Sequence, residues 1–136
     1  MIVYLVRHGE AVAEEIDPAR PLTEKGKAEV EATARGLWDE GARVEEIWHS
    51  GKLRAKQTAE ILARVLNISK VIEKEGLKPN DPVTPIAELI RQTNKTILIA
   101  GHLPFLTKLA SLLQPELGVI ELKSGGIVMR WVVALR

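Results

Sequence analysis

The sequence predicts a three-layer α/β/α fold with a mostly parallel sheet and an antiparallel edge strand. Short β-branched runs alternate along the chain with longer segments of helical periodicity, which is the pattern of a sheet covered by helices on both faces. The run from Thr96 to Ala100 is almost wholly apolar, as expected of a strand buried on both sides. Ser124-Gly125-Gly126 separates two further β-branched runs, which predicts an antiparallel hairpin closing one side of the sheet.

The first strand is expected over residues 2–6 and the first helix over residues 24–40. Thr23 is a suitable N-cap for this helix, and Gly41 supplies its stop. The far side of the helix is charged and is expected to face solvent. Its apolar side chains recur at helical spacing and are Val30, Ala34, Leu37 and Trp38.

A second strand is expected over residues 44–48, with Ser50 as the N-cap of a helix ending near Leu66. The buried stripe of this helix consists of Ala55, Ala59, Leu62 and Leu66. A third strand over 70–73 precedes a loop rich in Gly, Pro, Asn and Asp.

The remaining elements are a short helix, a strand, a helix and the hairpin. The short helix ends near Thr93 and starts at Asp81 or Thr84, since each is a capping residue followed by proline. The strand over 96–100 leads through Gly101-His102-Leu103-Pro104 into a helix with Leu106, Leu109, Ala110 and Leu113 on its apolar face. The hairpin strands are expected over 119–122 and 127–135.

Composition excludes several classes of protein. The chain has 136 residues, 46% hydrophobic and 27% charged, which is typical of one soluble domain spanning 1–136. A net charge of +1 gives no overall field for nucleic acid or an anionic membrane. The chain has no cysteine, which excludes disulfides and thiolate catalysis. No apolar run approaches the roughly 20 residues of a membrane span, and the apolar start lacks a basic leader. A cytoplasmic monomer is therefore expected.

Cationic and proton-bearing groups follow three of the predicted strands. Arg7 and His8 come directly after the first strand, Ser50 and Arg54 after the second, and His102 after the fourth. In an open α/β sheet, ligands bind beyond the carboxyl ends of the strands. These side chains are therefore predicted to meet at one edge of the sheet.

This set of residues indicates phosphoryl chemistry. Guanidinium groups bind phosphate oxygens bidentately and stay charged at working pH, and helix N-termini add backbone donors. No His/Asp/Glu cluster has obvious metal-ligand spacing, so neither a metal nor a cofactor is expected. A histidine with the ordinary pKa of about 6.5 is mostly neutral near pH 7 and has a lone pair for attack. Attack by His8 on phosphorus would form a phosphohistidine intermediate.

Four motifs resemble those of the histidine phosphatase superfamily, most closely its short SixA-type phosphohistidine phosphatases. They are Arg7-His8-Gly9-Glu10, Arg20-Pro21-Leu22-Thr23, Ser50-Gly51-Lys52-Leu53-Arg54-Ala55-Lys56-Gln57-Thr58 and Gly101-His102-Leu103-Pro104.

The resemblance implies a phosphoglycerate mutase-like fold and a role for each motif. His8 would be the phosphorylated residue, Arg7 and Arg54 the phosphate ligands, and His102 the second pocket histidine. Arg20 would lie at the pocket rim, and Ser50 would help to bind substrate.

Other residues in these motifs are expected to support the site. Gln57 and Thr58 are assigned to helix packing or loop support, and His49 to structure. Glu10 is open between orienting a loop and transferring a proton. Gly51 departs from the family, in which proline commonly follows the serine.

The general acid that ester-cleaving relatives supply stays open among Glu75, Glu73 and none. A phosphohistidine substrate needs less acid help, because imidazole is a weaker base than an alkoxide. The connections at 67–69 and 74–81 are too short for a lid, which favours phosphohistidine on a signalling protein such as a phosphotransfer domain. The alternatives are a broad phosphomonoesterase or sugar-phosphate phosphatase, and a non-catalytic phosphoprotein-binding module.

Overall fold

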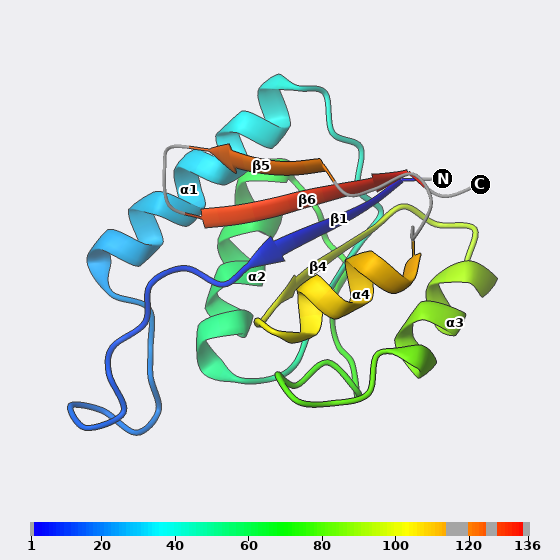
Figure 1. Ribbon diagram of the computed structural model, residues 1–136. Helices are drawn as coiled ribbons and strands as arrows, with labels where there is room; N and C mark the ends of the chain where they lie inside the picture. The colour runs from blue at the N-terminus through cyan, green and yellow to red at the C-terminus, as the bar shows by residue number, and fades with distance from the viewer. Residues whose placement is uncertain (1, 114–119, 125–127, 135–136) are drawn as a thin grey trace.

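The computed structural model describes residues 2–113, 120–124 and 128–134. Within these ranges the strands form one sheet in the order β3-β2-β4-β1-β6-β5 (Figure 1). The strand bounds are β1 Ile2–Arg7, β2 Glu46–His49, β3 Val71–Glu73, β4 Ile97–Gly101, β5 Ile120–Ser124 and β6 Val128–Ala134.

The first four strands in chain order run parallel, and β6 and β5 continue the sheet as an antiparallel pair. Arg7 of β1 is paired with Gly101 of β4, and His49 of β2 with Ala100 of β4. The carboxyl ends of β1, β2 and β4 are therefore level at one edge. The predicted fold class is confirmed, with two antiparallel strands at the end of the sheet.

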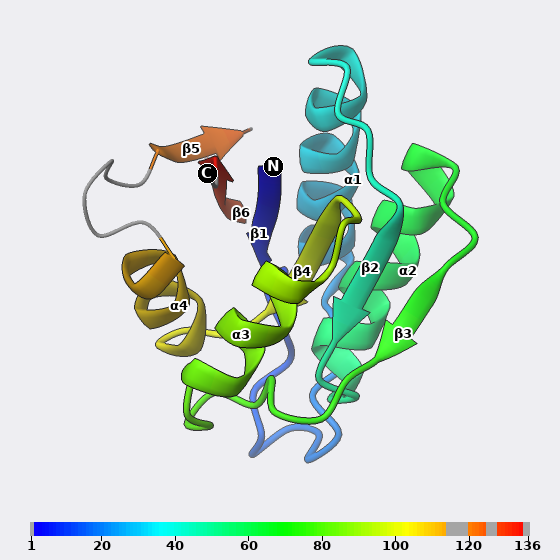
Figure 2. The same cartoon turned by 90° about the vertical axis from the view of Figure 1, so that its right-hand side faces the viewer.

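Helices cover both faces of the sheet (Figure 2). α1 (Glu24–Asp39) and α2 (Leu53–Leu66) lie on one face. α3 (Thr84–Gln92) and α4 (Phe105–Leu113) lie on the other. Each helix turns an apolar stripe toward the strands, so the sheet is buried on both sides, as its apolar sequence requires.

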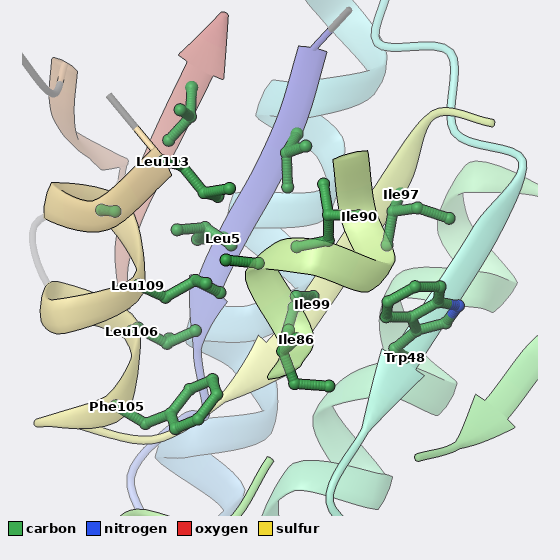
Figure 3. Packing of buried hydrophobic residues seen from close by; sticks show 14 of the residues in the cluster. Leu5, Trp48, Ile86, Ile90, Ile97, Ile99, Phe105, Leu106, Leu109 and Leu113 are labelled. Atoms are coloured by element: carbon green, nitrogen blue, oxygen red, sulfur yellow. The ribbon is translucent and has the colours of Figure 1, made fainter. Parts of the chain in front are cut away.

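Side chains from the sheet, α3 and α4 form one of two hydrophobic clusters (Figure 3). Leu5, Ile97 and Ile99 of the sheet contribute to this cluster and are fully buried. The opposite cluster joins Val6 of β1 to the stripes of α1 and α2. Burial of these aliphatic groups, at about 25 cal/mol per Å² of apolar surface, is the main force that holds the layers together.

The predicted ends of α1 are confirmed. The Thr23 hydroxyl accepts a hydrogen bond from the Gly26 amide at 2.9 Å, and Gly41 follows the helix with a φ of +78°, which a glycine adopts without strain. The prediction for Trp38 is wrong, because its side chain is 58% exposed while Leu37 is fully buried. Trp38 follows the buried stripe by one residue and so points away from it.

The predicted start of α2 is corrected, and one of the two predicted starts of α3, Thr84, is confirmed without the predicted capping role. Lys52 is the cap residue of α2, without a side-chain cap hydrogen bond, and the Ser50 hydroxyl is bonded to His102. Neither Asp81 nor Thr84 caps α3. Thr84 is its first helical residue after Val83, and the Asp81 carboxylate accepts the Lys78 amide hydrogen bond in the preceding turn.

The predicted hairpin is confirmed by the antiparallel pairing of β5 with β6. Residues 119, 127 and 135 of the predicted strands lie outside the described residues. No helix in the described part of the chain is long and apolar enough to cross a membrane.

Candidate active site

His8 lies directly beyond β1, at the edge where the parallel strands end. Its backbone amide donates to the Gly101 carbonyl at 2.9 Å, which ties the end of β1 to the end of β4. Its ring Nδ1 lies 2.7 Å from the Gly9 carbonyl oxygen. A carbonyl only accepts, so Nδ1 carries the proton and donates it. In the neutral ring Nε2 is then left with a free lone pair.

His102 follows β4 and faces His8. The two ring centroids are 5.2 Å apart and the rings are tilted by 58°. His102 is 1% exposed, and its Nε2 lies 2.7 Å from the Ser50 hydroxyl oxygen. The other ring nitrogen, Nδ1, is buried and has no hydrogen-bond partner. The second strand and the fourth strand thus deliver a hydroxyl and an imidazole to the same point.

Burial and positive charge keep both imidazoles neutral. Burial is the largest cause that lowers the pKa of His8 to about 4, followed by the charges of Arg54, Arg7 and Arg20, while the Gly9 hydrogen bond opposes the shift. Burial likewise lowers the pKa of His102 to about 3, with further contributions from His8 and Arg54. At pH 7 both rings are therefore unprotonated at one nitrogen.

Arg54 is a partly buried cation in the first turn of α2. Its Nε is buried without a hydrogen-bond partner. Burial is the main cause that lowers its pKa from the ordinary value, and the neighbouring charge of Arg20 adds to this shift. A guanidinium in this state has unused donors and is suited to bind an anion.

Arg20 lies in the long connection between β1 and α1 (Figure 1), and its charge is close enough to lower the pKa of Arg54. Its backbone has a φ of 50°, which costs a non-glycine residue roughly 1–2 kcal/mol. Its Nε donates to the Val12 carbonyl at 3.0 Å, and the Val12 amide donates to the Pro21 carbonyl at 2.8 Å. Strain of this kind persists where the surrounding structure enforces it and occurs often at functional sites.

The side chains of Gln57 and Thr58 support the catalytic loops, as expected. The Thr58 hydroxyl accepts from the Gly9 amide at 3.2 Å and donates to the Arg54 carbonyl at 2.8 Å. The Gln57 side-chain oxygen accepts from the Leu22 amide at 2.7 Å. α2 is thereby fixed to both ends of the long connection between β1 and α1.

A cavity of about 280 Å³ opens beside His8. Arg7 and Arg20 also line it, whereas Arg54, whose charge lowers the pKa of His8, and His102, whose ring faces His8, are not part of the lining. The structure thus brings His8, His102, Ser50, Arg54 and Arg20 into one neighbourhood, with Arg7 on the cavity wall. The complete lining is Arg7, His8, Gly9, Glu10, Ala11, Arg20 and Glu29.

The acidic candidates occupy distinct places. The Glu10 carboxylate accepts from the Thr23 hydroxyl at 2.8 Å, which ties the catalytic loop to the start of α1. The Glu73 carboxylate lies against Gly51, so close that a Cβ on Gly51 would meet it at 2.7 Å. Glu75 is exposed. The charges that shift the pKa values of His8 and His102 are those of cationic side chains.

His49 has the structural role that was expected. It is 4% exposed, and its Nδ1 accepts from the Gly51 amide at 3.0 Å. No group of three His, Asp or Glu side chains able to hold a metal ion occurs among the described residues. The positive charge near His8 comes from arginines.

Sequence reasoning missed Glu29, which it placed on the solvated face of α1. The Glu29 side chain is only 10% exposed and lines the cavity beside His8. Its position in the sequence carries the signal: it lies three residues after the buried Gly26 and four before the buried Thr33. Such spacing places a side chain on the same helix face as its neighbours.

A parallel sheet flanked by helices, with two facing histidines and arginines at its carboxyl edge, defines a phosphate-handling α/β protein. The model of the histidine phosphatase superfamily (branch 1) matches residues 3–80, so the chain belongs to this family. The match includes Arg7, His8, Ser50 and Arg54, while His102 lies beyond it.

Individual relatives point to the same group. The phosphohistidine phosphatase SixA of Escherichia coli (strain K12) is 31% identical over 121 residues, covering 85% of this chain and 75% of SixA. The structure of the protein histidine phosphatase SixA complexed with tungstate has a TM-score of 0.80 at 27% identity, covering 98% of this chain and 97% of that chain.

A third relative is the mitochondrial serine/threonine-protein phosphatase Pgam5 of Drosophila simulans. It is 30% identical over 86 residues, which make up 61% of this chain but only 30% of Pgam5. Membership of the superfamily and the similarity to SixA support a phosphatase activity for this chain.

Proposed function

We propose that this protein is a metal-free phosphatase that acts through a phosphohistidine at His8. The observation that carries the proposal is the hydrogen bond from His8 Nδ1 to the Gly9 carbonyl, at 2.7 Å, in a ring whose pKa is lowered to about 4. Nε2 attacks phosphorus while the bond to the leaving group breaks, and water then attacks phospho-His8 to release phosphate. The ring that accepts the phosphoryl group is already oriented and unprotonated at Nε2.

The surrounding groups bind the transferring phosphoryl group in this proposal. Arg7, Arg54 and Arg20 supply guanidinium donors, and the unpartnered Nδ1 of His102 supplies one more once the Ser50 hydroxyl has fixed its tautomer. Preorganised donors of this kind stabilise charge that develops on the equatorial oxygens. SixA was solved with tungstate, a tetrahedral oxyanion like phosphate, which supports an oxyanion site in this fold.

The preferred substrate is a phosphohistidine on a signalling protein such as a phosphotransfer domain. An imidazole leaves more readily than an alkoxide and needs less help from a general acid. This fits a site in which the charged groups that act on His8 are arginines. Two large apolar side chains are exposed on segments of the site, Ile16 at 80% in the long connection and Leu53 at 36% beside Arg54. Such side chains suit contact with a partner protein.

One experiment separates the candidate functions. Phosphate release is measured from a phosphorylated phosphotransfer domain and from p-nitrophenyl phosphate, with and without a chelator, for wild type and His8→Ala. The buried His49 gives the control His49→Gln, which keeps an acceptor for the Gly51 amide. We expect phosphohistidine turnover that survives chelation, is lost in His8→Ala and persists in His49→Gln.

The other outcomes contradict parts of the proposal. Ester turnover that far exceeds phosphohistidine turnover would favour a broad phosphomonoesterase or sugar-phosphate phosphatase. Activity lost on chelation would overturn the metal-free mechanism. Failure to form a phosphoenzyme with any donor would favour a non-catalytic phosphoprotein-binding module.

The proposal also includes a cytoplasmic monomer that consists of one domain. A single sheet with cores on both faces supports the domain assignment. Light scattering after size-exclusion chromatography tests the assembly state, and a mass near twice 15.0 kDa would contradict a monomer.

A further inference from the structure

Glu29 is a buried acidic side chain in the wall of a cavity that also holds Arg7, His8 and Arg20. Its side chain is 10% exposed, and both carboxylate oxygens are buried without a hydrogen-bond partner. Among the described residues, the cation paired with it is Lys25, whose Nζ is 4.0 Å away on a side chain that is 65% exposed. A buried carboxylate without hydrogen bonds is costly, since buried polar groups are nearly always paired. Its partner is therefore expected to arrive with a ligand.

The cavity limits what that ligand can be. Its volume of about 280 Å³ is just below the roughly 300–1,000 Å³ range of small-molecule sites, so it suits a small group such as a phosphoryl group with a small ring. Arg7 and Arg20 attract the phosphoryl oxygens. Glu10 also lines the cavity, but its side chain is exposed and bonded to Thr23. Glu29 is the acidic side chain of the lining whose oxygens are both buried without a partner, so it has the greater need of a donor on the remainder of the substrate.

We propose, building on the proposed function, that Glu29 accepts a hydrogen bond from the non-phosphorylated ring nitrogen of a substrate phosphohistidine. His8 Nε2 forms a bond to phosphorus, and the P–N bond of the substrate breaks. The electron pair of that bond returns to the substrate ring nitrogen. The ring keeps the proton on its other nitrogen, held by Glu29, and leaves as neutral imidazole. The reaction needs no further proton.

In this proposal the imidazole of His8 and the imidazole of the substrate each donate a hydrogen bond to an oxygen acceptor of the protein. The Gly9 carbonyl accepts the Nδ1 hydrogen of His8, and Glu29 accepts the corresponding hydrogen of the substrate ring. Each acceptor stabilises a proton on the ring nitrogen that does not carry phosphorus. A phosphorylated ring with that proton leaves as neutral imidazole when the P–N bond breaks. An oxygen ester has no such N–H, so Glu29 selects phosphoramidates over esters at the step in which the leaving group departs.

The test compares a phosphohistidine peptide with p-nitrophenyl phosphate, whose leaving group departs without a proton. Glu29→Met removes the acceptor and Glu29→Gln removes only the charge. Glu31→Gln is the control, since Glu31 lies on the same helix with a more exposed side chain paired to Arg35. We expect Glu29→Met to lower kcat/KM for the peptide by about tenfold to a hundredfold, the range for hydrogen bonds to charged groups, with Glu29→Gln between it and wild type. Ester turnover should stay within about twofold.

The outcomes distinguish a failure of the role of Glu29 from a failure of the proposed phosphatase function. Equal losses of kcat/KM on both substrates, or no loss on the peptide, would overturn the assignment of Glu29. The proposed function would still stand if wild type turns over phosphohistidine. Wild type without phosphohistidine turnover would overturn both. Thermal unfolding checks each variant, and if Glu29→Met does not fold, the isosteric Glu29→Gln decides by the same ratio.

Discussion

The Ser50 hydroxyl oxygen lies 2.7 Å from Nε2 of His102, and the opposite ring nitrogen of His102 is buried without a partner. The Lys52 amide also donates to Ser50 Oγ, at 3.3 Å. With that acceptor position used, the hydroxyl is free to donate its proton to Nε2. A neutral imidazole then carries its hydrogen on Nδ1, which is the tautomer required to donate to a phosphoryl oxygen.

Replacing Ser50 by alanine should therefore lower kcat more than it raises KM. We expect about a fivefold loss in kcat, because the ring loses the hydrogen bond that fixes its tautomer, worth roughly 1 kcal/mol. Ring ¹⁵N shifts of His102 report the tautomer directly. Ser50→Thr keeps the hydroxyl and should retain most of the activity. An unchanged tautomer and rate in Ser50→Ala would contradict this role.

The pKa of His8 should be visible in titration and in stability. Because burial and the arginines lower this pKa to about 4, the unfolded chain takes up a proton near pH 6.5 while the folded protein does not. The free energy of unfolding should then fall as pH drops from about 6.5 to about 4. Two-dimensional NMR of the His8 ring gives the pKa, and titration near 6.5 would contradict the account. Bound tungstate should raise the pKa, since an anion favours imidazolium.

Thr58 provides a test of the support beneath His8. Thr58→Val removes the acceptor of the buried Gly9 amide and should lower the free energy of unfolding by about 1–3 kcal/mol. Thr33 is the matched control, because it is fully buried and its hydroxyl has no partner. Thr33→Val should be neutral or stabilising. Equal effects of the two changes in urea unfolding would show that the Gly9 hydrogen bond contributes nothing.

Gly51 has a backbone conformation that favours glycine, and a side chain there would also meet the carboxylate of Glu73. Its φ is +89°, and a Cβ would meet the Glu73 carboxylate carbon at 2.7 Å. Gly41→Ala measures backbone strain alone, since its φ is +78° and nothing lies within 4 Å of its Cβ position. We expect it to cost about 1–2 kcal/mol and Gly51→Ala to cost more. Glu73→Ala should reduce the difference, and an unchanged difference would contradict the contact.

Much of this architecture follows from the sequence because its strands are buried on both faces. The runs around residues 2–6 and 96–100 are apolar at nearly every position, so neither predicts a strand with one face in solvent. They form β1 and β4, whose bounds differ from the predicted ones by one residue. Arg7 ends β1, and His8 and His102 follow β1 and β4 directly, so their common edge could be predicted from the parallel direction of the two strands. The local signal at Thr23 was also sufficient, since a capping hydroxyl needs only its own helix.

The remaining features depend on contacts between distant segments. Ser50 looks like a cap in sequence, but its hydroxyl is engaged by His102 from another strand. Glu29 looks like one of many surface charges, and its spacing from the buried Gly26 and Thr33 places it on the packed face of α1. Gly26 shows how close this packing is, because a Cβ there would meet the Glu10 carbonyl.

The measurement that tests the central claim most directly is the site of phosphorylation during turnover. Enzyme mixed with a phosphohistidine donor and quenched in base should carry one acid-labile phosphoryl group. Mass spectrometry should place it on the peptide containing His8, and His8→Ala should carry none. A phosphoryl group on any other residue, or full turnover by His8→Ala, would contradict nucleophilic catalysis by His8.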